Sequence, residues 1–79
     1  MKVRVLFFGA TADAAGKREA QIEMDDGSDA GSAADLILQN YPSLEHHKLL
    51  FAVNEEYVEP GHLMLDGDEL AIFTPVSGG

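Results

Sequence analysis

The residues best suited to chemistry in this sequence are its last two, Gly78 and Gly79. Neither has a Cβ, so this end of the chain can adopt backbone angles closed to other residues and can enter a channel too narrow for a side chain. The chemistry available there is that of the α-carboxylate itself. With 8 glycines in 79 residues, chance would place such a pair there in about 1% of chains of this composition. The sequence before the pair therefore decides its meaning.

The rest of the chain is poor in catalytic groups. It has no cysteine, which excludes disulfides and a cysteine nucleophile, so any sulfur chemistry must use sulfur brought from outside. His46 and His47 are adjacent and would point in different directions on a helix, and His62 falls in a turn, so their spacing predicts no metal site. Residues 9–16 are too sparse in glycine to cradle a phosphate. We expect no metal, no cofactor and no autonomous enzyme.

The charge of the chain narrows the choice of partners. Fourteen acidic and five basic residues give a formal net charge of −9, which disfavours nucleic acid because its phosphates would be repelled. A basic protein partner is favoured, and a solvated acidic surface without a specific partner is the alternative. The apolar run at residues 5–10 is too short for a signal peptide or a membrane span. We expect a cytoplasmic protein that uses no membrane.

The terminal glycines must be positioned by the elements that precede them, and the first two of these are predicted to be strands. Residues 2–8 and residues 18–24 both alternate between apolar and polar side chains, and are expected to form a hairpin. Residues 9–17, with two glycines and small side chains, are expected to form a loop. The side chains predicted to face the core are Val3, Val5, Phe7, Ala20, Ile22 and Met24.

One main helix is predicted next. Ser32 followed by Asp35 resembles a capping box and opens a helix that runs through Asn40, and Pro42 stops it. Residues 43–48 are expected to add one short helical turn. The buried contacts of the main helix are predicted to be Leu36, Ile37 and Tyr41.

The remaining strands complete an α+β layout. Strands are predicted at residues 49–53, 57–58 and 69–73, and pairing should end at Pro75 because proline cannot donate to a ladder. The order strand, strand, helix, strand, short strand, strand indicates a mixed sheet of about five strands with the helix on one face. We expect a single domain over residues 1–79, with residues 74–79 as a flexible C-terminal tail.

A small aromatic surface is expected beside this tail. On the last strand Leu70 and Ile72 share one face, while Phe73 shares the other with the charged Glu69. If the helix covers the first face, Phe8 and Phe73 become exposed, and Tyr57 is a further candidate. An exposed aromatic patch on so charged a chain is typical of a protein-docking surface, although a loop that covers the rings is the alternative.

Several segments, taken in order, resemble one known family. The residues at 5–8, 52–54, 65–69 and 73–79 are similar to those of the MoaD family, the ubiquitin-like sulfur carriers that form the small subunit of molybdopterin synthase. The most specific part is the tail Pro-Val-Ser-Gly-Gly after an Asp-Gly-Asp-Glu turn. Thr74 departs from the family, which often has a second proline there, and residues 10–15 lack the Arg-Glu often seen after the first strand.

The resemblance implies a β-grasp fold and a mechanism for molybdenum cofactor biosynthesis. In the family, a ubiquitin-activating-type (MoeB-like) enzyme adenylates the terminal glycine, here Gly79, and a sulfurtransferase or cysteine desulfurase system then supplies sulfur to give a thiocarboxylate. The large catalytic subunit of the synthase, in a heterotetramer, uses this sulfur to convert cyclic pyranopterin monophosphate into the molybdopterin dithiolene. The residues implied to contact partners are Phe8, Tyr57, Phe73, Pro75, Val76 and Ser77. Gly78 has no side chain, so it lets the C-terminus pass through a narrow channel.

The dimensions of the tail suit such a role. Residues 74–79 can span roughly 20 Å when extended, enough to deliver the terminal atom to a buried site, and Pro75 stiffens the base of this arm. Three alternatives stay open. The chain could carry sulfur for thiamine thiazole synthesis or tRNA thiolation, it could be a protein modifier conjugated through Gly79, or it could be a plain binding module with a disordered tail.

Overall fold

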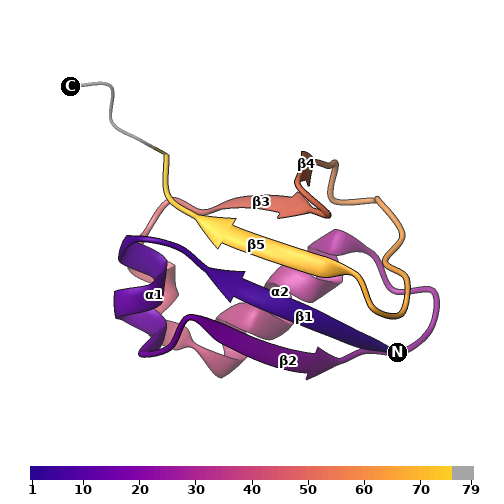
Figure 1. The fold of residues 1–79 in the computed structure, drawn as a ribbon, viewed down its shortest axis with the longest axis horizontal. Coiled ribbons are helices and arrows are strands. Elements are labelled where there is room, and N and C mark those ends of the chain that lie inside the picture. The colour runs from indigo at the N-terminus through magenta and orange to yellow at the C-terminus, as the bar shows by residue number, and fades with distance from the viewer. Residues whose placement is uncertain (76–79) are drawn as a thin grey trace.

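A five-stranded mixed sheet dominates the fold in the computed structural model, which describes residues 1–75 (Figure 1). Val76, Ser77, Gly78 and Gly79 lie outside the described residues. The elements, in chain order, are β1 (Lys2–Phe7), α1 (Ala10–Ala15), β2 (Glu19–Glu23), α2 (Ala30–Asn40), the 3-10 helix η1 (Pro42–His46), β3 (Leu50–Val53), β4 (Glu56–Tyr57) and β5 (Glu69–Phe73).

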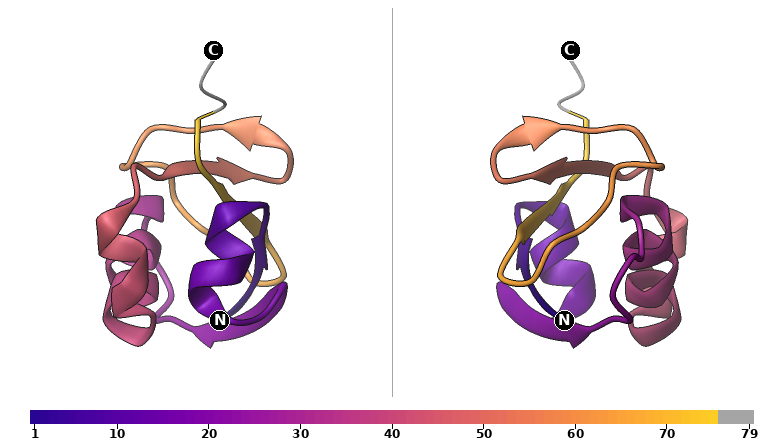
Figure 2. Two further views of the ribbon diagram at one scale, coloured as in Figure 1. Left: turned by 90° about the vertical axis from the view of Figure 1, so that its left-hand side faces the viewer. Right: turned by 90° about the vertical axis from the view of Figure 1, so that its right-hand side faces the viewer.

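The sheet order is β2-β1-β5-β3-β4. The first strand pairs in parallel with the last, with Val5 opposite Leu70, and the other neighbours are antiparallel. The predicted hairpin of the first two strands is confirmed, since Val3 pairs with Ile22. Figures 1 and 2 show α2 packed across one face of this sheet. The predicted α+β class with one main helix on one face is therefore confirmed.

The core lies between α2 and the face of the sheet that carries every second residue of the central strands. Its side chains are less than 10% exposed and include Val3, Val5, Phe7, Ile22, Leu70 and Ile72, as the alternation predicts. Ile37 of α2 is fully buried as predicted. Tyr41, just after α2, meets Phe7 edge-on with ring centroids 5.2 Å apart. Met64 is only 2% exposed, and no pattern in its loop predicts this.

The helical cap of α2 differs from the prediction. Asp29, and not Ser32, is the N-cap, and its carboxylate accepts a 2.9 Å hydrogen bond from the Ser32 N–H. This bond holds the pKa of Asp29 below its ordinary value. The helix begins three residues earlier than predicted because the neighbouring loop supplies acceptors: the N–H of Ala30 donates to His62 O and that of Gly31 to Pro60 O.

The predicted loop over residues 9–17 is wrong, because it contains the helix α1. Its residues are alanines apart from Thr11 and Asp13, and alanine is the strongest helix former. The two glycines do not disrupt this helix but bound it. Gly9 precedes it at φ 57°, and Gly16 ends it in the left-handed conformation at φ 77°.

Candidate functional site

The C-terminal end of β5 forms the base of the predicted tail. This strand pairs on both sides, and its last residue, Phe73, lies opposite Leu50 of β3. Thr74 is half-buried and Pro75 is exposed. Regular pairing thus ends before Pro75, as predicted. The four residues beyond it, which include both predicted reactive glycines, fall outside the described part of the chain.

A buried threonine ties this base to the rest of the molecule. Thr11 is fully buried, and its Oγ1 accepts a 2.9 Å hydrogen bond from the Phe8 N–H. The same oxygen lies 2.7 Å from Phe8 O and 2.8 Å from Ile72 O, within reach of its single donated proton. The Phe8 N–H also donates to Ile72 O at 3.0 Å. These contacts join the first turn of α1 to the next-to-last residue of β5, so they fix the point at which the chain leaves the sheet.

The predicted aromatic residues gather at this end. The rings of Tyr57 and Phe73 lie 5.8 Å apart, with Tyr57 72% exposed and Phe8 50% exposed. A hollow of about 400 Å³ is lined by Phe8, Gly9, Phe73, Thr74 and Pro75. The structure therefore brings together four of the six side chains predicted to contact partners, and their role in docking stays a prediction.

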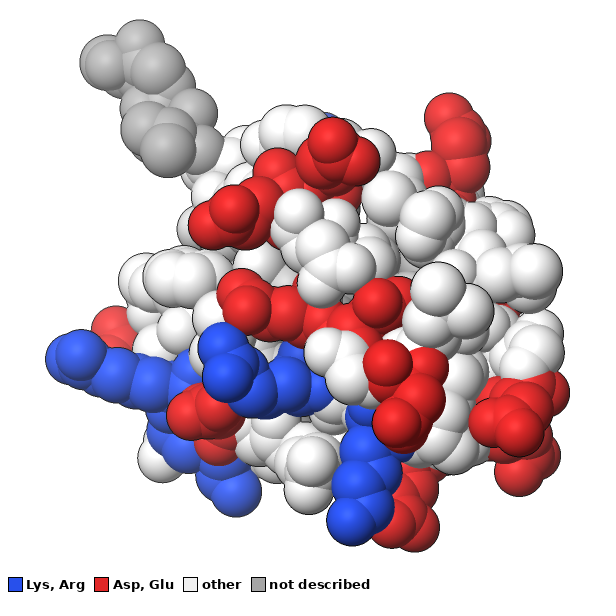
Figure 3. All heavy atoms as spheres, turned by 45° about the vertical axis from the view of Figure 1, so that its right-hand side comes forward, with Lys and Arg blue, Asp and Glu red and all other residues white. Residues whose placement is uncertain are grey.

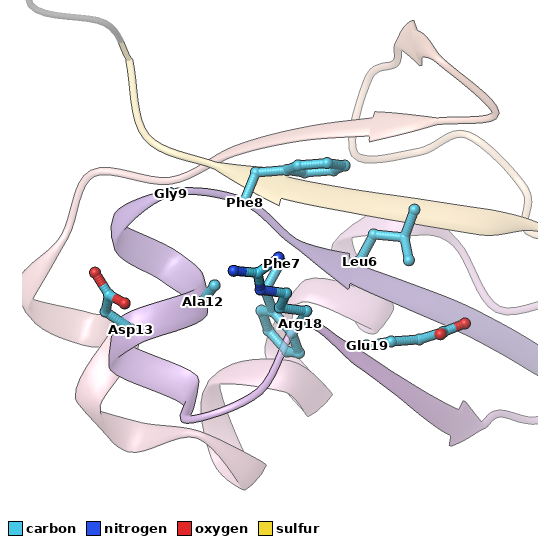
Figure 4. Close-up of a pocket in the computed structure, with 8 residues that line it drawn as sticks. All are labelled: Leu6, Phe7, Phe8, Gly9, Ala12, Asp13, Arg18 and Glu19. Carbon is cyan, nitrogen blue, oxygen red and sulfur yellow. The ribbon is translucent and has the colours of Figure 1, made fainter.

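A second, larger cavity of about 580 Å³ adjoins this hollow and is lined by the end of β1, by α1 and by the start of β2 (Figure 4). Phe8 and Gly9 line both cavities. Figure 4 shows Arg18 between the carboxylates of Asp13 and Glu19, with Leu6 and Phe8 above it. This wall mixes apolar rings with both signs of charge, a composition suited to protein contact more than to a small anion.

Four of the five basic residues lie in the first two strands or next to them. Lys2, Arg4, Lys17 and Arg18 all lie on β1 or next to β2, and the fifth basic residue is Lys48. Figure 3 shows most of the visible basic side chains gathered on one side, with acidic ones beside them and over the rest of that view. Arg4 bridges three strands, with its guanidinium 3.3 Å from Glu19 of β2 and 3.0 Å from Glu69 of β5.

Within residues 1–75 we find no group of three or more side chains that could hold a metal ion. No helix in that part of the chain is long and apolar enough to cross a membrane. Sequence reasoning missed Thr11 and the cavity beside Arg18. The signal for Thr11 was its position as the one hydroxyl residue in an alanine-rich run, but its partner Ile72 is 61 residues away.

Comparison with known proteins decides the family. The sequence profile of the ThiS family matches residues 5–79. This chain belongs to the ThiS family. Among curated relatives, it is 36% identical to the "Molybdopterin synthase sulfur carrier subunit" of Chlamydomonas reinhardtii over 100% of both chains. It is also 32% identical to "Small archaeal modifier protein 1" of Haloferax volcanii, over 91% of this chain and 94% of that one. The predicted resemblance to MoaD is confirmed.

Solved structures agree on the β-grasp fold of this ThiS family member. SAMP1 from Haloferax volcanii superposes with a TM-score of 0.91 at 29% identity, with 100% of both chains covered. A complex of subunits 1 and 2 of the molybdopterin-converting factor from Helicobacter pylori contains a chain with a TM-score of 0.73 at 26% identity, again over 100% of both chains. A Caldiarchaeum ubiquitin, at 13% identity and a TM-score of 0.67 over 100% of this chain and 98% of that one, shows the ubiquitin-like fold alone.

Proposed function

We propose that this chain is the sulfur carrier subunit of a cytoplasmic molybdopterin synthase and that Gly79 carries the sulfur. The observation that supports this most directly is the end-to-end similarity, at 36% identity, to a subunit of that name. The sequence also ends in the two glycines that such chemistry needs, and they follow a strand whose exit is fixed by Thr11.

The proposed chemistry starts from an unreactive group. An α-carboxylate, with a pKa of roughly 3.5, is ionised at neutral pH and is a poor electrophile. An adenylating enzyme of the ubiquitin-activating type joins this carboxylate to AMP with loss of pyrophosphate from ATP. Sulfur delivered at the oxidation level of sulfide by a sulfurtransferase or cysteine desulfurase system then attacks the acyl carbon, displaces AMP and leaves a thiocarboxylate on Gly79. Two such sulfurs convert cyclic pyranopterin monophosphate into the dithiolene of molybdopterin.

The proposed partner surface is the aromatic end of the sheet. Phe8, Tyr57 and Phe73 would contact the large catalytic subunit, while Pro75, Val76 and Ser77 would lead Gly78 and Gly79 into its active site. Support comes from the similar Helicobacter pylori chain, which is part of a complex of subunits 1 and 2 of a molybdopterin-converting factor. We propose the heterotetramer of the family as the functional assembly.

The test is intact-mass spectrometry of the chain after incubation with an adenylating enzyme, ATP and a sulfur donor. We expect the mass of one oxygen-to-sulfur exchange, located by fragmentation at Gly79. A variant that lacks Gly79 should gain no sulfur and should keep the melting temperature of the parent chain, which serves as the control for folding. An unchanged mass under conditions that load a related carrier would reject the proposal. Loading without transfer to the pterin precursor would instead indicate a carrier for thiamine thiazole or tRNA thiolation.

A second candidate is a protein modifier joined through Gly79 to lysines of target proteins. It is favoured by the 32% identity to small archaeal modifier protein 1 and by the TM-score of 0.91 for SAMP1. The two functions can be separated by expressing a tagged chain in the organism from which the sequence comes and mapping the peptides of the proteins that copurify with it. Target lysines joined by an isopeptide bond to the C-terminal peptide of this chain, which ends in Ser-Gly-Gly, would support the modifier. A pterin-converting large subunit bound without conjugates would support the synthase.

A further inference from the structure

A small apolar pit lies on the helix side of the sheet, away from the aromatic surface. It has a volume of about 130 Å³, close to the roughly 150 Å³ of an engineered apolar cavity that takes up benzene. The beginning of α2, the middle of β3 and the chain after β4 form its walls. The lining residues are Ala30, Gly31, Ala34, Phe51, Val58 and Pro60.

Gly31 leaves space beside Pro60 in the wall of the pit. A Cβ at Gly31 would lie 3.4 Å from both the Cβ and the carbonyl oxygen of Pro60. The opposite wall is the half-buried Phe51, and Ala34 is half-buried as well. The pit is therefore accessible from outside and has room for one aliphatic side chain.

The charged residues next in sequence to the lining residues are acidic. Asp29 lies on its rim, because its Oδ1 is 3.6 Å from the position of a Cβ at Gly31. Glu59 is exposed and precedes Pro60 in the chain. Asp29 forms a backbone bridge with Leu63, whose side chain is 61% exposed. None of the five Lys and Arg residues of the chain lies between residues 19 and 47 or after residue 48. The segments that form the pit thus present carboxylates and no cation.

This surface and the aromatic surface lie on opposite faces of the sheet. Phe51 pairs with the buried Ile72, whereas Tyr57 pairs with Ala52, and Phe73 with Leu50. Directly paired residues share a face and successive residues alternate. Figure 1 shows the start of α2 at the end of the sheet opposite to the exit of β5. A partner in the pit would leave the tail and its docking surface free.

We infer that this pit is a second protein-docking site, which takes one aliphatic side chain, such as leucine, from a partner segment rich in Lys and Arg. The apolar walls select the anchor, and the carboxylates of Asp29 and Glu59 select its basic flanks. The same carboxylates disfavour nucleic acid and anionic lipid surfaces. The site is independent of any chemistry at Gly79.

The experiment is a titration of the full ¹⁵N-labelled chain, at low salt, with a synthetic peptide that has one leucine flanked by lysines. We expect saturable shifts of the amides of Gly31, Ala34, Phe51 and Val58. The same peptide with glycine in place of leucine should bind about tenfold more weakly. Replacement of its lysines by glutamates should abolish binding.

Two variants fill the pit. Ala34→Leu and Gly31→Ala should each weaken the leucine peptide about tenfold, and the amide spectrum of each variant reports whether it is folded. Gln39→Leu adds the same side chain to exposed surface at the far end of α2 and should leave binding unchanged. Equal affinity of the leucine and glycine peptides would overturn the inference, because it would mean general charge attraction. Shifts centred on Tyr57 and Phe73, or unaltered binding by both filled variants, would overturn it too.

Discussion

At the scale of single residues, Thr11 connects the first helix to the strand that carries the tail. Its hydroxyl can be removed without a change of shape by Thr11→Val. The backbone groups it contacts keep other partners, since Phe8 N–H still donates to Ile72 O. We therefore expect a loss of only about 1 kcal/mol in the free energy of unfolding, measured by urea denaturation, and faster hydrogen exchange at the Phe8 amide.

Thr11→Ser is the matched variant for this prediction, because it keeps the hydroxyl and removes the buried methyl group. It should retain slow exchange at Phe8 although it too loses about 1 kcal/mol of stability. If the valine variant exchanged at Phe8 as slowly as the parent chain, the hydroxyl would not be what holds α1 to β5.

At the scale of elements, Asp29 determines where α2 begins. Its carboxylate accepts from the Ser32 N–H, and that bond lowers its pKa in the folded chain. A lowered folded pKa stabilises the fold above the ordinary pKa of an aspartate, about 3.9, and this contribution is lost as pH falls through the folded pKa. Asp29→Ala should lower the melting temperature at pH 7 by roughly a few degrees, and less at pH 3.

Asp29→Asn serves as the control, because an asparagine side chain can still cap the helix but cannot titrate. It should be more stable than Asp29→Ala at every pH, and its stability should lack the acid-dependent loss assigned to this carboxylate. Calorimetry of the three chains from pH 3 to pH 7 provides the comparison. Equal melting temperatures for the alanine variant and the parent at pH 7 would contradict the role of this cap.

Elements with strong periodicity could be predicted from sequence, and those set by tertiary contacts could not. β5 was predicted to the residue because alternation from Glu69 to Phe73 is bounded by a turn and by Pro75. α1 was missed because two glycines outweighed the helix propensity of its alanines. Met64 packs in the hydrophobic core and its N–H donates to Ser28 O, contacts that no local pattern encodes. The pit and the Thr11 contacts likewise join segments far apart in the chain.

At the scale of the whole molecule, the excess of carboxylates opposes folding. The radius of gyration of the Cα atoms is 11.8 Å, while the Debye length falls from about 30 Å at 0.01 M salt to about 3 Å at 1 M. At low salt, nearly all of the fourteen acidic side chains therefore repel one another across the fold. The melting temperature should rise by roughly several degrees as sodium chloride is raised across this range.

Single charge reversals separate this repulsion from other effects of salt. Glu59 lies on an exposed segment without a basic neighbour in sequence. Glu59→Lys should raise the melting temperature at low salt, because it makes the formal net charge of −9 less negative by two units. Lys48→Glu should lower it for the same reason. Both differences should vanish near 1 M salt, where screening removes interactions between exposed charges. If either shift persisted there, local contacts of that side chain, and not the net charge of the molecule, would be its cause.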